Sequence, residues 1–204
     1  MKTRIAIFAS GFGSNARAIM QACHDKKINA EIVLVVSDKK NANVHQFAKE
    51  YFVQSVSFER ADFQSKEAHE IAIINRLKHD QVDFIVLAGY MRLIGKSLLD
   101  EYEGKIINIH PSLLPKYRGL DAIGQAIQNG EQEIGVTVHY VDAGMDTGKI
   151  IAQKKIEQNI QGKEKAEIEK WVHEVEHELY VNVLKDIDRK STRLNSSHLV
   201  ISYA

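Results

Sequence analysis

The chain has 204 residues, of which 44% are hydrophobic and 26% charged, enough to bury the core of one globular domain. Its 27 basic and 27 acidic residues balance, which argues against a polyelectrolyte binder of nucleic acid or of an anionic membrane. One cysteine, Cys23, excludes an internal disulfide, no Cys/His group has zinc-ligand spacing, and no apolar run approaches the roughly 18 residues that span a bilayer. We therefore expect a soluble cytoplasmic protein without a metal site, and an enzyme is the favoured class.

Strand-like and helix-like segments alternate along the first two thirds of the chain. Buried strands are predicted over residues 30–36 and 84–88, further strands over 4–8 and 106–109, and a weak strand near 53–56. Helices are predicted over residues 15–24, with Ser14 as the cap, and over 42–50, 65–78 and 96–102. This alternation predicts an α/β fold built on a doubly wound, mostly parallel sheet.

The last third has a different pattern. Residues 134–140 alternate as a half-exposed strand does, and residues 149–156 form a partner strand after the loop 142–148. A long helix is predicted over residues 163–187. From Asp188 the chain reads DRKSTRLNSSHLVISYA, which matches a translated sequencing-library adapter. We therefore expect one natural domain over residues 1–187 and a non-native tail without function over 188–204.

A glycine-rich turn, GFGSNA over residues 11–16, follows the first strand and opens the first helix. Glycines let backbone amides approach an anion, and a helix N-terminus adds partial positive charge, so a phosphate site is one interpretation. A tight turn capped by serine is the simpler alternative. The same residues fit a loose dinucleotide fingerprint, with Asp38 after the second strand as a ribose-binding acid.

The segment NIHPSLLP, residues 108–115, is the most specific signal. The chain has two prolines where average usage would give about ten, and both lie in this segment, at the carboxyl end of a predicted central strand. Asn108 and His110 are two residues apart, so their side chains share a face of that strand. An amide beside an imidazole suits stabilisation of an oxyanion with proton transfer, although a histidine satisfied within a turn is the alternative.

The acidic loop 142–148, DAGMDTG, could deliver a carboxylate beside His110 and favour the charged ring. Its alternative is a hairpin loop whose carboxylates cap backbone amides. The sequence does not by itself bring Asp146 to His110.

Together, GFGSN (11–15), AGYMR (88–92), NIHPSLLP (108–115) and DAGMDTG (142–148) resemble the motifs of the glycinamide ribonucleotide formyltransferase family of folate-dependent enzymes. The resemblance covers residues 4–184. It implies the Rossmann-like formyltransferase fold, with a C-terminal strand pair and a long last helix. It also implies formyl transfer from 10-formyltetrahydrofolate to the amine of glycinamide ribonucleotide in purine synthesis, without a metal.

The resemblance also implies residue roles. Asn108, His110 and Asp146 are expected to be catalytic. Gly13, Ser14 and Asn15 are expected to hold the substrate phosphate, and His173 and Glu176 to bind the ribonucleotide, although Glu176 could also be a solvated helix residue. The expected folate-binding residues are Lys66, Met91, Arg92, Leu93, Ile94, Asn108, Asp142, Ala143, Gly144, Met145 and Asp146.

Two alternatives stay open. One is another folate-dependent formyltransferase or a formyltetrahydrofolate hydrolase, although this chain lacks room for their additional domains. The other is a dinucleotide-binding Rossmann protein built on Gly11, Gly13 and Asp38. Small molecules are the expected partners, with no nucleic acid and no membrane, and the oligomeric state is undetermined.

Overall fold

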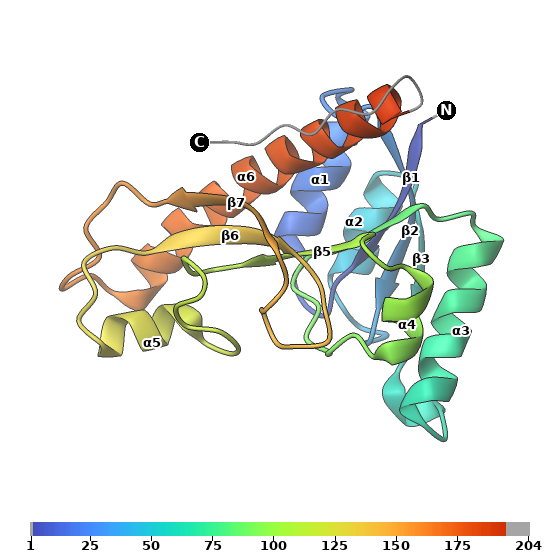
Figure 1. Ribbon diagram of the computed structural model, residues 1–204, viewed down its shortest axis with the longest axis horizontal. Helices are drawn as coiled ribbons and strands as arrows, with labels where there is room; N and C mark the ends of the chain where they lie inside the picture. The colour runs from blue at the N-terminus through green and yellow to red at the C-terminus, as the bar shows by residue number, and fades with distance from the viewer. Residues whose placement is uncertain (1, 195–204) are drawn as a thin grey trace.

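The structure of the protein is a computed structural model that describes the backbone of residues 2–194 and the side chains of residues 2–187. Its centre is a seven-stranded sheet of order β3-β2-β1-β4-β5-β6-β7 (Figure 1). The first five strands in this order are parallel, and β6 and β7 are antiparallel to their neighbours. The strands are β1 (Thr3–Phe8), β2 (Ala30–Ser37), β3 (Gln54–Ser57), β4 (Phe84–Leu87), β5 (Ile106–His110), β6 (Gly135–Tyr140) and β7 (Ile150–Lys155).

Helices cover both faces of the sheet. One face packs a core shared with α1, α2, α5 and α6, and the other packs a core shared with α3 and α4. Successive strand residues alternate between these cores, as Ile5 and Ile7 enter the first and Ala6 and Phe8 the second. The helices are α1 (Ser14–His24), α2 (Val44–Glu50), α3 (Lys66–His79), α4 (Lys96–Glu101), α5 (Ala122–Gln128) and α6 (Lys165–Leu194), with a 3₁₀ turn, η1, at Arg60–Asp62.

The predicted doubly wound, mostly parallel sheet is confirmed, two local expectations are wrong, and two short elements were missed. Helix α5 and the turn η1 were not predicted. Strand β6 is not half-exposed, because five of its six residues are buried. Ser14 does not cap α1, since Gly13 is the N-cap residue and no side-chain bond closes that end.

The last helix, α6, continues to Leu194 and so passes residue 187, where the sequence predicts that the domain ends. Residues 195–204 of the predicted tail lie outside the described residues, and its non-native origin stays a prediction. Among residues 2–194, no helix is long and apolar enough to cross a membrane.

Candidate active site

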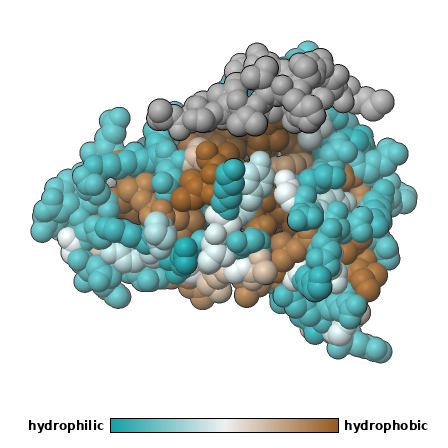
Figure 2. All heavy atoms as spheres, viewed as in Figure 1, coloured by the Kyte–Doolittle hydropathy of each residue, from teal (hydrophilic) through white to brown (hydrophobic). Residues whose placement is uncertain are grey.

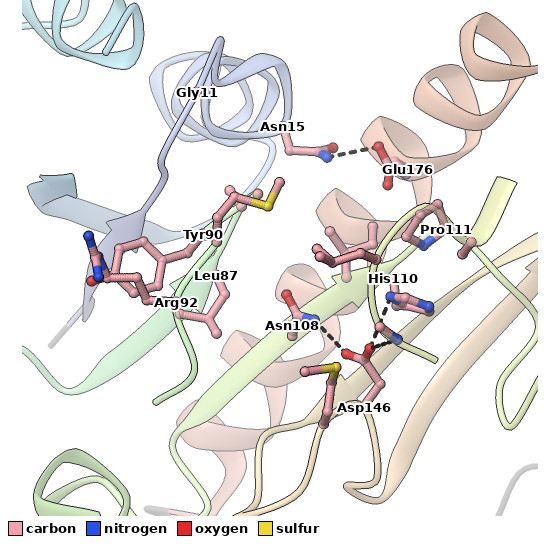
Figure 3. A pocket seen from close by; sticks show the side chains of 18 of the residues that line it. Gly11, Asn15, Leu87, Tyr90, Arg92, Asn108, His110, Pro111, Asp146 and Glu176 are labelled. Carbon is pink, nitrogen blue, oxygen red and sulfur yellow. Dashed lines mark hydrogen bonds and ion pairs between the residues drawn. The ribbon is translucent and has the colours of Figure 1, made fainter. Parts of the chain in front are cut away.

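The strand order places a crevice at the carboxyl ends of β1 and β4. The chain winds outward in opposite directions from this pair of strands, and open α/β sheets bind ligands where the order reverses. A cavity of about 750 Å³ lies there, bounded by residues 11–15, 87–94, 108–111 and 119–123 together with parts of the 141–146 loop and α6. In Figure 3, labelled side chains from β5, α1, α6 and the loops point into this space.

The carboxylate of Asp146 is the centre of a polar cluster in this cavity. Its Oδ2 accepts a hydrogen bond from the Gly119 N–H at 2.8 Å and lies 3.4 Å from His110 Nδ1. Its Oδ1 lies 3.4 Å from Asn108 Nδ2 and 3.5 Å from His139 Nε2. The structure thus brings the predicted amide, ring and acid together, with the amide and ring on one face of β5 (Figure 3).

The surroundings of Asp146 favour its ionised form. Burial raises the pKa of Asp146, but the hydrogen bonds from His139 and the Gly119 N–H, with the charge of His110, outweigh burial and leave that pKa below its usual value. His110 meets acceptors at both ring nitrogens, since Nε2 lies 2.7 Å from the Tyr117 carbonyl and Nδ1 faces Asp146. Each ring nitrogen therefore has an oxygen acceptor within reach.

His139 is a fourth member of the cluster that the sequence analysis did not single out. Its ring is buried, with Nδ1 2.8 Å from the Tyr140 carbonyl and Nε2 3.3 Å from Asn108 Nδ2. The antiparallel pairing of β5 and β6 sets Asn108 opposite His139. The alternation of β6 predicted the face that His139 occupies. The register that turns this face toward Asn108 was not visible in the sequence.

One end of the cavity is formed by the glycine-rich loop after β1. Gly13 has φ of 82°, and a Cβ there would lie 2.9 Å from the side chain of Val44, so this turn requires glycine. The first turn of α1 begins at Ser14, and Gly13, Ser14 and Asn15 all line the cavity. The first N–H groups of a helix have no partner within the helix, and in α1 they belong to residues that line the cavity. Such N–H groups are what an anion site requires.

Asn15 and Glu176 connect that loop to α6. Asn15 Nδ2 donates to Glu176 Oε2 at 2.9 Å (Figure 3). Asn15 Oδ1 is buried and has no hydrogen-bond partner among the residues that the structure describes. Glu176 is 6% exposed, so it is not a solvated helix residue, and it lines the cavity together with His173. Burial raises the pKa of Glu176, although the bond from Asn15 and the charge of His173 act the other way. These acceptor oxygens suit a ligand with N–H or O–H donors.

The opposite end of the cavity is more apolar. Met91, Arg92, Leu93 and Ile94 all line it, with Gly144 and Met145 from the loop after β6. Met91 and Leu93 are 68% and 57% exposed although they are large and apolar. Figure 2 shows apolar residues gathered across the middle of one face of the molecule, with hydrophilic residues along both sides. Exposed apolar groups at a cavity mouth are typical of a binding site for a flat organic ligand.

Three predicted folate residues lie outside the cavity wall in the described part of the chain. Lys66 begins α3, and its Cε would lie 2.7 Å from a Cβ built on Gly95. Asp142 accepts hydrogen bonds from the Gly144 N–H at 3.0 Å and from the Thr147 hydroxyl at 2.6 Å, so its carboxylate shapes the loop. The third residue, Ala143, is exposed beside it.

Asp38 does not face the cavity either. It is 6% exposed, and its Oδ2 accepts a hydrogen bond from Arg92 Nε at 2.8 Å. A ribose-binding acid needs a carboxylate directed into the crevice, so the dinucleotide alternative loses the residue on which it depended. Over the described residues, no group of three or more His, Cys, Asp or Glu side chains is arranged to hold a metal ion.

A glycine-rich loop and an amide–imidazole–carboxylate cluster at the switch point of this sheet define a class of group-transfer enzyme. The model of the Formyl transferase family matches residues 3–184, and the chain belongs to this family. It is 49% identical over 185 residues to phosphoribosylglycinamide formyltransferase of Bacillus subtilis (strain 168), covering 90% of this chain and 94% of that protein.

Solved structures agree with this placement. The crystal structure of phosphoribosylglycinamide formyltransferase from Bacillus halodurans has a TM-score of 0.90 at 44% identity, covering 96% of this chain and 100% of that one. The structure of glycinamide ribonucleotide transformylase 1 from Geobacillus kaustophilus has a TM-score of 0.89 at 48% identity, covering 92% and 100%. The predicted family and the predicted Rossmann-like formyltransferase fold are therefore confirmed.

Proposed function

We propose that this chain transfers the formyl group of 10-formyltetrahydrofolate to the primary amine of glycinamide ribonucleotide, in the cytoplasm, as a step of purine synthesis. The observation that carries the proposal is the contact of Asn108, His110 and His139 with the Asp146 carboxylate in a cavity that the glycine-rich loop and the apolar residues 91–94 also line. The family and the names of the relatives support the same reaction.

The two ends of the cavity correspond to the two substrates. The phosphate of the ribonucleotide would lie at Gly13 and Ser14, against the N–H groups that open α1. Asn15 and Glu176, with His173 beside them, offer acceptors to the N–H and O–H groups of that substrate. The folate ring would lie at the apolar end, along the backbone of residues 91–94 and the loop 142–146, with Lys66 toward its outer end.

The reaction joins the amine nitrogen to the formyl carbon, breaks the bond from that carbon to N10 and returns a proton to N10. Negative charge develops on the formyl oxygen, where the Asn108 amide and the charged His110 ring can donate hydrogen bonds. One donor of this kind is typically worth about 10²–10³ in rate. The ionised Asp146 stabilises the charged ring until His110 gives up its proton.

Two hydrogen bonds must change for this chemistry. His110 Nε2 donates to the Tyr117 carbonyl at 2.7 Å, so donation to a substrate requires that this bond be exchanged. Asn108 Nδ2 lies 3.3 Å from His139 and 3.4 Å from Asp146, both at or beyond the long end of the usual range. Its amide can therefore turn toward the formyl oxygen at little cost.

The direct test mixes the purified protein with glycinamide ribonucleotide and 10-formyltetrahydrofolate, and follows tetrahydrofolate release by absorbance. The proposal expects release that depends on the ribonucleotide and that is lost in His110→Ala without loss of the folded state. Release that is independent of the ribonucleotide would identify a hydrolase instead. A melting temperature raised by NAD(P) and unchanged by a folate analogue would contradict the proposal in favour of a dinucleotide-binding protein.

A further inference from the structure

The segment after β4, residues 90–95, is tied down by three buried polar side chains from other parts of the fold. The Ser10 hydroxyl, two residues after β1, accepts a hydrogen bond from the Met91 N–H at 2.8 Å. Asp38, at the end of β2, holds the Arg92 side chain, and Glu70 of α3 accepts the Gly95 N–H at 2.6 Å. Their exposed fractions are 1% for Ser10, 6% for Asp38 and 4% for Glu70.

The Glu70 contact is the tightest of the three. A Cβ on Gly95 would lie 2.3 Å from Glu70 Oε1, so the carboxylate reaches the backbone because residue 95 has no side chain. Gly95 has φ of −99°, so glycine is required here for close approach and not for an unusual conformation. Gly95 is also the N-cap residue of α4 and has no capping side chain of its own. Glu70 therefore fixes the junction between the apolar cavity wall and α4.

Burying a carboxylate costs stability unless it is well bonded, so the position of Glu70 needs an explanation. The backbone that it fixes leads directly into Ile94 and Leu93, which line the apolar end of the cavity. Met91 and Leu93 expose their side chains to solvent and so contribute little burial to hold this wall in shape. The burial of Ile94 and the buried hydrogen bonds from outside the segment together hold this wall in shape.

We propose that Glu70 is a positioning residue for folate recognition, and this inference rests on the proposed function. Through Gly95 its carboxylate holds the backbone of residues 91–94 in the form that receives the folate ring. It contacts neither the Asn108–His110–Asp146 cluster nor the glycine-rich loop. Glu70 therefore acts on binding of the folate and not on binding of the ribonucleotide or on the chemical step.

The test compares three variants by steady-state kinetics. Glu70→Leu removes the acceptor at similar volume, and we expect the KM for 10-formyltetrahydrofolate to rise about tenfold, with kcat and the KM for the ribonucleotide within about twofold. Glu70→Gln keeps an acceptor oxygen and should restore the KM for folate to within about twofold of wild type. Glu67→Leu, which removes an exposed carboxylate one turn earlier on α3, is the control and should leave all three constants unchanged.

Gly95→Ala is the substitute test in case Glu70→Leu fails to fold. It disturbs the same contact from the Gly95 side and should produce the same folate-specific rise in KM. A direct readout is the melting-temperature shift with 5-formyltetrahydrofolate, which should shrink in Glu70→Leu and return in Glu70→Gln. An unchanged KM for folate in folded Glu70→Leu, or an equal loss for both substrates, would overturn the inference. An inactive wild type would instead contradict the proposed function.

Discussion

Asp146→Asn tests the centre of the proposed site. The variant keeps an oxygen that can accept the Gly119 N–H, but it removes the negative charge that lies 3.4 Å from His110 and 3.5 Å from His139. Opposite charges about 4 Å apart attract by about 4 kcal/mol at the effective dielectric constant of about 20 that suits protein sites. About 1.4 kcal/mol corresponds to tenfold in rate, so an attraction of this size corresponds to a loss in kcat/KM of about 10³-fold.

The measurement is the initial rate of tetrahydrofolate release at several concentrations of both substrates. Asp100→Asn is the control for loss of one negative charge, because the Asp100 side chain on α4 is 63% exposed. We expect kcat to fall in Asp146→Asn with little change in either KM, since the charge acts on the transition state. A kcat within about threefold of wild type, in a variant with an unchanged melting curve, would refute the role assigned to Asp146.

Four further predictions concern stability and pH. The lowered pKa of Asp146 means that its contribution to stability is present above about pH 4 and is lost in acid, so the melting temperatures of wild type and Asp146→Asn should converge there. The pKa of Glu176 is raised, so its effect on stability has the opposite dependence on pH. Urea unfolding should show wild type losing stability relative to Glu176→Gln as pH rises above about 4. Tyr180→Phe removes a hydroxyl that donates to the Leu87 carbonyl at 2.7 Å and should cost about 1 kcal/mol of unfolding free energy. His139→Leu removes a hydrogen bond that lowers the pKa of Asp146, so the acid limb of the pH–rate profile should move to higher pH.

Each of these expectations has a contrary result. Stability curves of wild type and Asp146→Asn that diverge in acid would reverse the sign worked out above, as would a Glu176→Gln variant that gains on wild type in acid. Full stability of Tyr180→Phe would show that the bond to Leu87 is offset by water in the unfolded chain. An unmoved acid limb in His139→Leu would show that His139 does not act on Asp146.

Local patterns predicted much of the fold because most of the elements are long or strongly apolar. Helix α5 was not predicted because it contains Gly124, a residue that disfavours the interior of a helix. Its one signal was Asp121, whose carboxylate caps it by accepting the Gly124 N–H at 3.2 Å. Strand β6 was misjudged for a different reason. Alternation shows that Thr137 and His139 share a face, but it does not show that residues 111–121 and the loop after β6 cover that face.

The candidate site could likewise be predicted from the sequence only in part. Asn108 and His110 could be paired from sequence because a strand has a period of two. Asp146 could not be placed beside them by pattern, because its position depends on groups that no motif reveals. They are the Gly119 N–H that binds its carboxylate and its own left-handed φ of 53°. Glu70 acts on the apolar end of the cavity in the same way, through a backbone N–H. The motif residues thus supply reactive groups, while backbone donors and buried carboxylates determine where those groups meet.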